Sequence, residues 1–428
     1  MIHFLYQIFA IPALYLASQV GRLFNPKIKQ GWDGRRKLFH TLAIEMAANK
    51  GKSPRFWIHN SSMGEFEQAK PLITEIKKRY PESMVIVSFF SPSGLENVTS
   101  NFGADVLCYL PFDRYLYAKR FFDLIRPDMG IIIRHDFWPN HFLELKRRNI
   151  PLILVNASIR KRAFYRLPGV LFIHRWLYQS FTSVLTVSPE TAELYQHYRL
   201  GKAPVDSVGD TRYDQVVARA KAAEALIQNL RPLKKDRLCF VMGSTWPSDE
   251  DVLIDALERM HRENHKLPWC IFVPHEPHEE HLSILEYKLS KFNLKVHRLS
   301  KVENQSVKEN DMLIIDRIGI LASLYGLSDL AFVGGGFGPG VHNVLEPAAF
   351  GQAVLYGPRC KNSFEAGELE SEGIGHVIEN SEAVYHLLMN LYDDPSCMKQ
   401  LGHQASVWVN QNVGATKRIV DRLEQYLS

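Results

Sequence analysis

The sequence has few cysteines, and they form no recognisable pattern. Its five cysteines, in 428 residues, are far apart and include no Cys-x-x-Cys pair: Cys108, Cys239, Cys270, Cys360 and Cys397. An odd number of scattered cysteines argues against a disulfide framework and against a structural zinc site. We therefore predict buried thiols and a reducing compartment.

Internal repeats and extremes of composition are also lacking. No repeat of fixed period is visible, and with 46% hydrophobic and 23% charged residues the composition is that of an ordinary globular protein. Disorder and low complexity are therefore excluded. The net charge of +5 is modest, and we expect no nucleic-acid partner. A chain of this length is expected to form two domains.

The N-terminus lacks the marks of a removable signal peptide. Residues 4–20 are almost wholly apolar, with no basic segment before them and no Ala-x-Ala cleavage site. Their length is close to the ~20 residues that span a bilayer. A basic cluster follows, which would keep the next domain in the cytoplasm and attract an anionic leaflet: Arg22, Lys27, Lys29, Arg35, Arg36 and Lys37. We predict that residues 1–24 form a membrane anchor or an interfacial helix; the alternative is a buried amphipathic helix of the first domain.

Short apolar runs alternate with helical segments along most of the chain. This alternation is typical of βαβ units, and it predicts two doubly wound parallel sheets. The first set of predicted strands is 56–59, 84–88, 105–109, 129–133, 152–155 and 183–187, and the second is 238–242, 269–273, 312–315, 330–333 and 353–356. We predict a first Rossmann-like domain over 35–210, a connecting helix and linker over 211–237, a second Rossmann-like domain over 238–403, and a C-terminal helix over 404–428 that returns toward the first domain.

A glycine-rich loop follows the predicted strand 330–333. The loop is Gly-Gly-Gly-Phe-Gly-Pro-Gly from Gly334 to Gly340, and it leads into a predicted helix at 344–350. Glycines let the backbone approach a ligand, and the N–H groups at a helix start suit a phosphate. Glu346 could accept hydrogen bonds from ribose hydroxyls. The spacing matches neither the dinucleotide fingerprint nor the P-loop, so those two classes fit poorly.

A second polar loop, residues 357–364, follows the next predicted strand and so lies on the same carboxyl edge, where open α/β sheets bind ligands. Together with two other segments, these loops resemble the 3-deoxy-D-manno-octulosonic acid (Kdo) transferases of Gram-negative lipopolysaccharide synthesis. The match comprises Gly335 and Gly336 with His342-Asn-Val-Leu-Glu-Pro-Ala348, the loop at 357–364, Trp57-Ile-His-Asn-Ser-Ser-Met-Gly-Glu65 and Trp138-Pro-Asn140. The resemblance covers nearly the whole chain and implies the GT-B architecture, in which the two domains face each other across a cleft.

Glu65 is the candidate general base. It lies at the start of a predicted helix, where a carboxylate is also favourable simply because of the helix dipole. From position alone the two explanations are equal, and Glu67 offers a second acid. The matching glutamate of Kdo transferases is the proposed base, which implies this role for Glu65 and substrate contacts for Ser62 and Gly64.

The segment Arg134-His-Asp-Phe-Trp-Pro-Asn140 departs from the family pattern. Kdo transferases usually have Glu-Thr-Glu ahead of Trp-Pro-Asn, whereas Arg134 and His135 stand in the first two places here. Asp136 alone retains an acid and is expected to orient the acceptor. Arg134 is expected to pair with an anionic group of a substrate.

In the second predicted domain, donors for a phosphate or for the donor sugar's carboxylate are expected at Ser244 and Thr245. The acids at 249–251 look like a metal motif but suit a helix start better. His275, His278 and His281 have a spacing that could hold a metal. Pro277 and the family's Pro-Arg/His-x-Pro loop favour nucleotide contact by His275 instead.

The resemblance implies transfer of Kdo from CMP-Kdo to a lipid A precursor at the cytoplasmic face of the inner membrane, with inversion and without a metal or other cofactor. Asn343 and Glu346 would help to hold CMP. Two alternatives remain open: another GT-B nucleotide-sugar transferase or epimerase, and a non-catalytic, membrane-attached nucleotide-binding protein.

Overall fold

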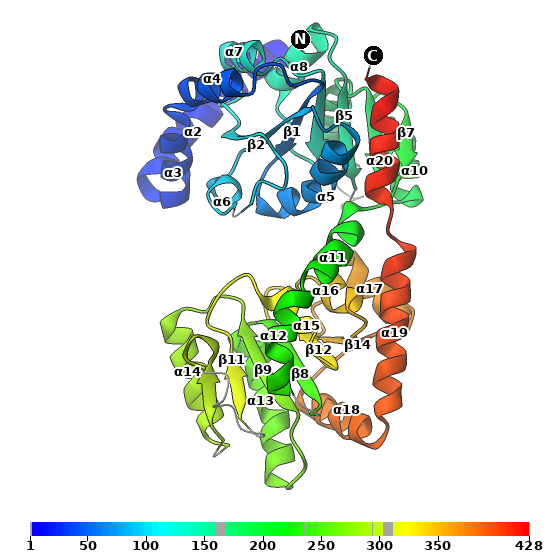
Figure 1. Cartoon of the computed structure of the whole chain (residues 1–428). Coiled ribbons are helices and arrows are strands. Elements are labelled where there is room, and N and C mark those ends of the chain that lie inside the picture. The colour runs from blue at the N-terminus through cyan, green and yellow to red at the C-terminus, as the bar shows by residue number, and fades with distance from the viewer. Residues whose placement is uncertain are drawn as a thin grey trace. The chain divides into compact units, whose positions relative to one another are not determined.

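The computed structural model describes residues 2–98, 100–159, 168–234, 237–292, 294–302 and 311–427. The chain divides into two compact units (Figure 1). Unit 1 comprises residues 1–215 and 413–428, and unit 2 comprises residues 216–412. Residues 235 and 236 of the predicted linker lie outside the described residues.

Unit 1 is built on a parallel sheet. Within the described residues it has seven strands in the order β3-β2-β1-β4-β5-β6-β7. Helices cover both faces, so the central strands are apolar throughout rather than alternating. The strands are β1 (Arg55–Asn60), β2 (Met84–Phe89), β3 (Val106–Tyr109), β4 (Met129–Ile133), β5 (Leu152–Ala157), β6 (Ser183–Thr186) and β7 (Val205–Ser207).

Two hydrophobic clusters, one on each face of this sheet, hold unit 1 together. Trp57 of β1 belongs to one cluster with Phe122 of α7, whereas Ile58 belongs to the other with Phe66 of α5 and Ile419 of α20. Neighbouring residues of a strand point to opposite faces, which explains this division. The helices are α3 (Pro26–Arg35), α4 (Leu38–Ala48), α5 (Met63–Arg79), α6 (Pro92–Leu95), α7 (Tyr115–Ile125), α8 (Pro139–Arg147), α9 (Pro168–Tyr178), α10 (Pro189–His197) and α20 (Ala415–Leu423), followed by the 3₁₀ turn η4 (Glu424–Tyr426).

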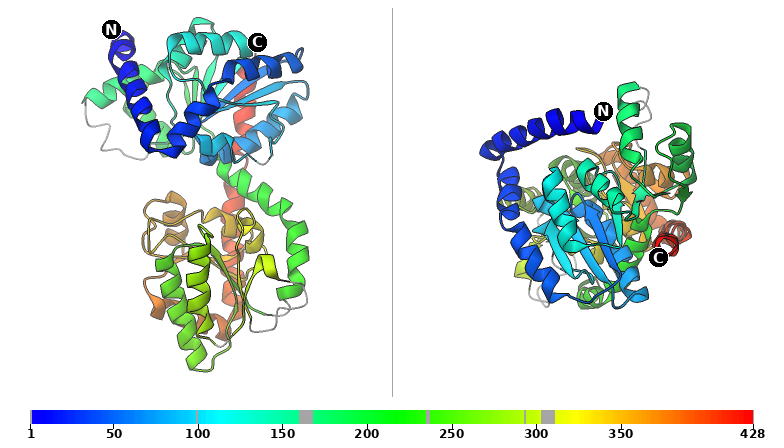
Figure 2. Two further views of the ribbon diagram at one scale, coloured as in Figure 1. Left: turned by 90° about the vertical axis from the view of Figure 1, so that its left-hand side faces the viewer. Right: turned by 90° about the horizontal axis from the view of Figure 1, so that it is seen from above.

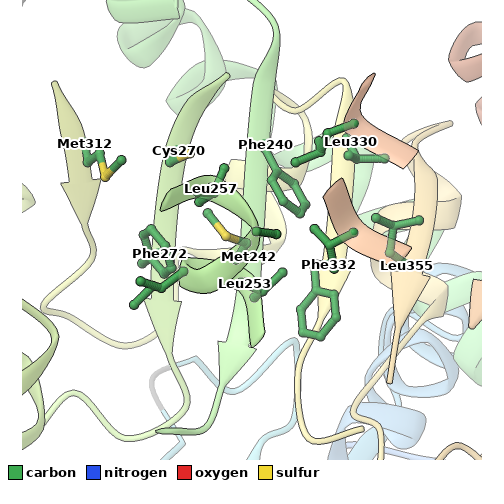
Figure 3. Close-up of a cluster of buried hydrophobic side chains, with 14 of the residues drawn as sticks. Phe240, Met242, Leu253, Leu257, Cys270, Phe272, Met312, Leu330, Phe332 and Leu355 are labelled. Atoms are coloured by element: carbon green, nitrogen blue, oxygen red, sulfur yellow. The ribbon is translucent and has the colours of Figure 1, made fainter. Parts of the chain in front are cut away.

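Unit 2 repeats the design. Its described residues form a parallel sheet of seven strands in the order β10-β11-β9-β8-β12-β13-β14. Phe240 and Met242 of β8 pack with Phe332 of β12 and Leu355 of β13 in a buried cluster on one face (Figure 3). The strands are β8 (Cys239–Thr245), β9 (Trp269–Pro274), β10 (Val296–Arg298), β11 (Met312–Ile314), β12 (Leu330–Val333), β13 (Ala353–Tyr356) and β14 (Gly375–Val377).

The helices of unit 2 begin with α11 (Thr211–Ala222), whose first turn still belongs to unit 1. The others are α12 (Glu224–Lys234), α13 (Pro247–Arg262), α14 (Glu279–Ser290), α15 (Leu321–Tyr325), α16 (Leu345–Ala349), α17 (Phe364–Ser371), α18 (Ser381–Asp393) and α19 (Pro395–Gln411), with the 3₁₀ turn η3 (Leu299–Lys301). The prediction of two doubly wound parallel sheets is confirmed.

The predicted C-terminal helix over 404–428 is wrong as a single element. The structure has two helices there, because Gly414 adopts φ 96° and separates α19 from α20. A left-handed residue cannot continue a right-handed helix, and glycine adopts that conformation at no steric cost. As a result α19 belongs to unit 2, and α20 packs within unit 1.

The N-terminal segment is helical from residue 2 to residue 24. It consists of α1 (Ile2–Leu5), the π-helical turn η1 (Tyr6–Ala10) and α2 (Ile11–Phe24). Among the described residues it is the one helix long and apolar enough to cross a membrane, judged by length and composition alone. None of its residues is buried, so the alternative of a core helix is wrong. The segment runs along the outside of unit 1 (Figure 2).

Candidate functional site

Each sheet has a point where the strand order reverses. In unit 1 the chain leads from β1 through β2 to β3 on one side and then places β4 on the other side of β1. In unit 2 the corresponding point lies between β8 and β12. Open parallel sheets bind ligands at the carboxyl ends of the strands beside such a point. The predicted site residues lie at the ends of these four strands or follow them, except His275, which follows β9.

The unit 1 point carries a pocket of about 200 Å³. Residues that follow β1 and residues that end or follow β4 line it together: Ser61, Glu65, Ile133, Arg134, His135 and Asp136. The structure thus brings Glu65, Arg134 and Asp136 to one pocket, although about seventy positions separate the first from the other two. Ser62 and Gly64 are not part of this lining; Ser62 instead caps α5.

Glu65 is the third residue of α5 and takes part in a capping box with Ser62. One carboxylate oxygen, Oε2, accepts hydrogen bonds from the Ser62 N–H at 3.1 Å and from the Ser62 hydroxyl. This arrangement satisfies orphan donors at the helix start, which is the structural role considered above. Within the described part of the chain, Oε1 makes no hydrogen bond. Glu65 can therefore cap the helix with one oxygen and offer the other to the pocket.

Asp136 is held by a buried polar chain whose members were not among the predicted site residues. Its Oδ2 accepts a hydrogen bond from His59 Nε2 at 2.8 Å, and His59 Nδ1 lies 2.9 Å from the Ser88 hydroxyl. The Trp57 indole donates to the same hydroxyl at 2.8 Å. His59, Ser88 and Trp57 are all fully buried. A polar chain of this kind holds its terminal carboxylate in one orientation.

The pKa of the Asp136 carboxyl reflects two opposed effects. Burial acts to raise this pKa, whereas the hydrogen bond from His59 and its charge lower it, with smaller contributions from Trp138 and Ser61. The net result is a pKa below the ordinary value. Asp136 is therefore an anionic acceptor of hydrogen bonds at neutral pH and is poorly suited to donate a proton.

Arg134 stands in an unusual backbone conformation. Its φ is 66°, in the left-handed region that non-glycine residues rarely adopt, and its N–H donates to the Val155 carbonyl at 2.9 Å. Such a conformation costs about 1–3 kcal/mol and tends to occur at functional sites. Beside it, His135 Nε2 lies 3.1 Å from the Ser158 hydroxyl. The departure from the family's acids therefore falls directly on the pocket wall.

In unit 2 the glycine loop lies against neighbouring backbone. A Cβ on Gly334 would lie 2.2 Å from the Ser244 carbonyl oxygen, and one on Gly336 would lie 2.4 Å from the Gly357 nitrogen. Any side chain at these two positions would push the loop away from the ends of β8 and β13. The glycines thus serve close packing of the loop, whatever they do for a ligand.

Asp249 accepts hydrogen bonds from backbone N–H groups of this loop. Its fully buried carboxylate accepts from the N–H groups of Gly335 at 2.7 Å, Phe337 at 3.0 Å and Trp246 at 2.9 Å. Burial raises the Asp249 pKa, and these three bonds oppose that effect. The expectation that the acid serves the start of α13 agrees with its capping-box geometry. Because the Gly335 N–H already points at Asp249, groups other than this N–H would hold a phosphate here.

Three aromatic rings stack beside the loop. The rings of His275 and His342 are 4.3 Å apart, and those of Trp246 and His275 are 5.1 Å apart. The Trp246 indole donates to His342 Nε2 at 3.0 Å. Burial and the neighbouring His275 lower the pKa of His342 to about 4. Both histidines are therefore placed by stacking, and His342 is neutral at physiological pH. Trp246 and His342 were not among the predicted site residues.

Three further predicted contacts in unit 2, Thr245, Asn343 and Glu346, already have protein partners. The Thr245 hydroxyl donates to Glu250 at 2.9 Å, and Glu346 pairs with Arg219 of α11 at 2.6 Å. Ser244 has φ 53°, in the left-handed region, and Asn343 is exposed while its side chain accepts from the Leu345 N–H. Sequence reasoning missed Arg219, because nothing near residue 219 indicates its carboxylate partner.

The histidines considered as metal ligands have other neighbours. His281 Nε2 lies 3.0 Å from Glu250, and the exposed His278 lies 3.5 Å from Glu276. His275 belongs to the aromatic stack described above. In the described ranges of the chain, no three metal-ligating side chains form a group that could hold an ion.

Comparison with known proteins gives the family. Residues 30–215 match the family model described as 3-deoxy-D-manno-octulosonic-acid transferase. A transferase of that name from Aquifex aeolicus is 30% identical over 338 residues, covering 78% of this chain and 85% of the relative. Another from Haemophilus influenzae is 28% identical over 377 residues, covering 87% of each chain.

Solved structures agree on the fold. The UDP-GlcNAc 2-epimerase from Neisseria meningitidis, bound to UDP-GlcNAc, aligns over 87% of this chain and 100% of its own with a TM-score of 0.62 and 13% identity. MurG from Acinetobacter baumannii aligns over 87% and 99% with a TM-score of 0.53 and 12% identity. At such identities the likeness concerns the GT-B-type fold alone. The resemblance inferred from the loops is confirmed by the sequence relatives: the chain belongs to the 3-deoxy-D-manno-octulosonic acid transferase family of glycosyltransferases.

Proposed function

We propose that this glycosyltransferase moves Kdo from CMP-Kdo to a hydroxyl of a lipid A precursor at the cytoplasmic face of the inner membrane. Kdo transfer in lipopolysaccharide synthesis follows from the family. The identities of the donor and the acceptor and the roles of individual residues go beyond what family membership gives. The observation that supports them best is the pocket in which Glu65, Arg134 and Asp136 meet at the carboxyl edge of β1 and β4.

In this proposal Glu65 is the general base. The acceptor oxygen attacks the anomeric carbon of Kdo, its proton passes to Glu65, and the bond between that carbon and the phosphate oxygen breaks so that CMP leaves with the electron pair. Attack opposite the leaving group inverts the anomeric centre. Oε1 of Glu65 suits this role, because Oε2 is engaged with Ser62. General bases of this kind contribute about 10²–10⁴-fold to rate.

Asp136 and Arg134 have supporting roles. The lowered pKa of Asp136 keeps it anionic, so it can accept a hydrogen bond from the acceptor sugar while His59 holds its other side. Arg134, on the same pocket wall, would pair with a phosphate or carboxylate of a substrate. Arg134 stands where the family has the first glutamate of Glu-Thr-Glu, so its proposed role differs from that of the acid it replaces.

The donor would be held by groups of unit 2. The proposed contacts are Ser244 and Thr245 at the end of β8, Gly335 and Gly336 after β12, and Asn343 and Glu346 around the start of α16, with His275 at the nucleotide. Asn343 and His275 are exposed and can meet a ligand. Thr245 and Glu346 would have to share a ligand with Glu250 and Arg219. Charge that develops on the leaving phosphate would be stabilised by the polar groups of these loops.

The test is a product assay on the purified full chain. Incubation with CMP-Kdo and a detergent-dispersed lipid A precursor should yield an acceptor heavier by one or more Kdo residues in mass spectrometry, together with free CMP. UDP-GlcNAc in place of CMP-Kdo should yield neither transfer nor epimerisation. Turnover of the UDP-sugar, or binding of CMP-Kdo without product, would contradict the proposal and support one of the two alternatives.

A further inference from the structure

The N-terminal helix can meet a membrane in two ways. If it spans the bilayer, its axis stands across the membrane and most of its side chains face lipid. If it lies in the membrane plane, one side stays on the protein and the other enters the leaflet. The two arrangements make different demands on the polar side chains of residues 2–24.

Polar side chains near the start of the helix are fastened to unit 1. The Tyr6 hydroxyl donates to Asp113 Oδ2 at 2.7 Å, and His3 Nε2 lies 3.2 Å from Asn140 Oδ1. Gln7 donates to the same Asn140 oxygen. Residues 6 and 7 come three and four positions after residue 3, so all three lie on one side of the helix.

The acceptors of these bonds belong to the body of unit 1. Asp113 is buried and also accepts from the Asn140 N–H at 3.1 Å and from His141 Nδ1 at 2.7 Å. Asn140 is the first turn of α8 and is itself buried, with its amide donating to the Asp113 carbonyl at 2.6 Å. Tyr6 therefore completes a hydrogen-bonded centre rather than lying loosely on a surface.

Aromatic contacts extend this attachment along the helix. Tyr6 lies 5.9 Å from the ring of Trp176 in α9, and Tyr15 lies 5.2 Å from Trp32 in α3. The Arg22 guanidinium stands 5.5 Å over the same Trp32 ring. The helix thus contacts the rest of unit 1 from residue 3 to residue 22, over nearly its full length.

The opposite side of the helix is apolar and exposed. Phe9 is 66% exposed, Leu16 65% and Phe24 82%. Single exposed apolar residues are ordinary, but a run of them along one helix marks a surface for lipid or protein. Neighbouring elements add Leu116 of α7 and, one turn before Trp176 on α9, Phe172 and Ile173. Figure 2 shows α1, η1 and α2 on the outside of unit 1.

Positive charge lies beside the helix. A pocket of about 570 Å³ is lined in part by Ile11 and Tyr15 of the helix and by Arg114 beside α7. The Arg114 guanidinium is exposed and stands 5.5 Å over the Tyr15 ring. Exposed lysines at 27 and 29 follow in α3. Arginine and lysine beside an apolar face are the composition of helices that lie on anionic membranes.

We propose that residues 2–24 lie in the plane of an anionic leaflet, with Phe9, Leu16 and Phe24 inserted and with Tyr6 still bonded to Asp113. A spanning helix would carry His3, Tyr6 and Gln7 into hydrocarbon and leave Asp113 and Asn140 without them, and polar groups in lipid need internal partners. The in-plane arrangement keeps every one of these bonds. The inference rests on the membrane location proposed above but not on the role of Glu65.

Depth measurements separate the two arrangements. Cys397 is the exposed cysteine of the structure, since the other four are buried, so a Cys397→Ser background gives selective labelling. Single cysteines at Phe4, Phe9, Leu16 and Phe24 would carry an environment-sensitive fluorophore in the full chain on vesicles containing phosphatidylglycerol. Twenty helical residues rise about 30 Å, so labels on Phe4 and Phe24 of a spanning helix would differ in depth by roughly that amount.

We expect all four labels to shift to the blue and to be quenched at one shallow depth, about 5–10 Å below the headgroups. A depth profile that crosses the bilayer, or labels that remain in water, would overturn the proposal. As a second measurement, Phe9→Ser with Leu16→Ser should lower the vesicle-bound fraction at least tenfold, while transfer to detergent-dispersed acceptor keeps its rate. Unchanged vesicle binding would also overturn it. Because depth and vesicle binding are measured without turnover, failure of the transferase proposal would leave both readouts intact.

Discussion

The contact between His59 and Asp136 can be isolated with two substitutions at one position. In His59, Nε2 bonds Asp136 and Nδ1 faces Ser88. Glutamine places its amide nitrogen near the position of Nε2, so His59→Gln can keep the bond to Asp136. Asparagine reaches only to the position of Nδ1, so His59→Asn keeps Ser88 and loses Asp136. Both variants lose the ring, so their difference reports the Asp136 bond.

The surroundings of Asp136 determine how far the two variants should differ in stability. A hydrogen bond to a charged group contributes about 1.5–3 kcal/mol, and the Asp136 side chain is 17% exposed, so water can replace part of the loss. We expect His59→Asn to be less stable than His59→Gln by about 1.5–2 kcal/mol. Because the folded-state pKa of Asp136 is lowered, this stabilisation is present above the ordinary pKa of 3.8 and is lost as the pH falls through the folded-state pKa.

Hydrogen exchange of β1 and β4 amides in the full chain measures the stability difference, and the CMP-Kdo assay measures its effect on turnover. We expect kcat to fall about 10–100-fold in His59→Asn, because a misplaced positioning group costs about that much, and to stay within about threefold in His59→Gln. CMP affinity should be unchanged in both. Equal exchange and equal kcat in the two variants would refute the reasoning.

Three further predictions concern unit 2. Asp249→Ala removes three hydrogen bonds from backbone N–H groups, so the free energy of unfolding should fall by about 3 kcal/mol or more. The amides of residues 334–343 should then exchange faster, and unchanged exchange would show that Asp249 does not stabilise the loop. His342 should titrate by NMR with a midpoint of about 4. Because the folded-state pKa of His342 is lowered from the ordinary value of 6.5, the stability of the protein should fall as the pH drops from 6.5 toward 4. A midpoint near 6.5 would count against the stacked arrangement. Gly336→Ala should destabilise by about 1–3 kcal/mol because its Cβ would meet Gly357 backbone at 2.4 Å. Gly338→Ala should not, because the nearest atom to its Cβ would be the flexible Ser248 hydroxyl at 3.3 Å and the next would be at 3.8 Å. Similar melting temperatures for the two variants would refute the packing argument.

Most of the fold could be predicted from the sequence because its strands are buried on both faces. Each predicted strand is present, since continuous apolar runs bounded by turns give a strong signal. The strands that were missed are β7, β10 and β14, which are three residues each and lie at sheet edges. Their sequences are Val-Asp-Ser, Val-His-Arg and Gly-His-Val, so none of them is a continuous apolar run of the kind by which the other strands were recognised. The break at Gly414 was missed for another reason: the apolar residues around it continue a helical pattern.

Some residues of the candidate site could likewise be predicted from the sequence, whereas others could not. Glu65 and Asp136 could be placed near each other because both follow parallel strands at one sheet edge. His59 could not be assigned a role, because its partner is 77 positions away and the two meet only through the pairing of β1 with β4. Asp249 was correctly expected at the start of α13, but its bonds to Gly335 and Phe337 depend on how β8 and β12 pair.

The most direct test of the transferase mechanism is the turnover of Glu65→Gln with radiolabelled CMP-Kdo and lipid A precursor. Glutamine retains a side-chain oxygen for the capping box of α5, so the helix should persist and CMP should bind with unchanged affinity. Glu67→Gln, two residues on and bonded to Lys70 and Gln215, is the matched control. We expect kcat to fall about 10²–10⁴-fold in Glu65→Gln and to stay near normal in Glu67→Gln. A Glu65→Gln enzyme that retains wild-type kcat would contradict this mechanism.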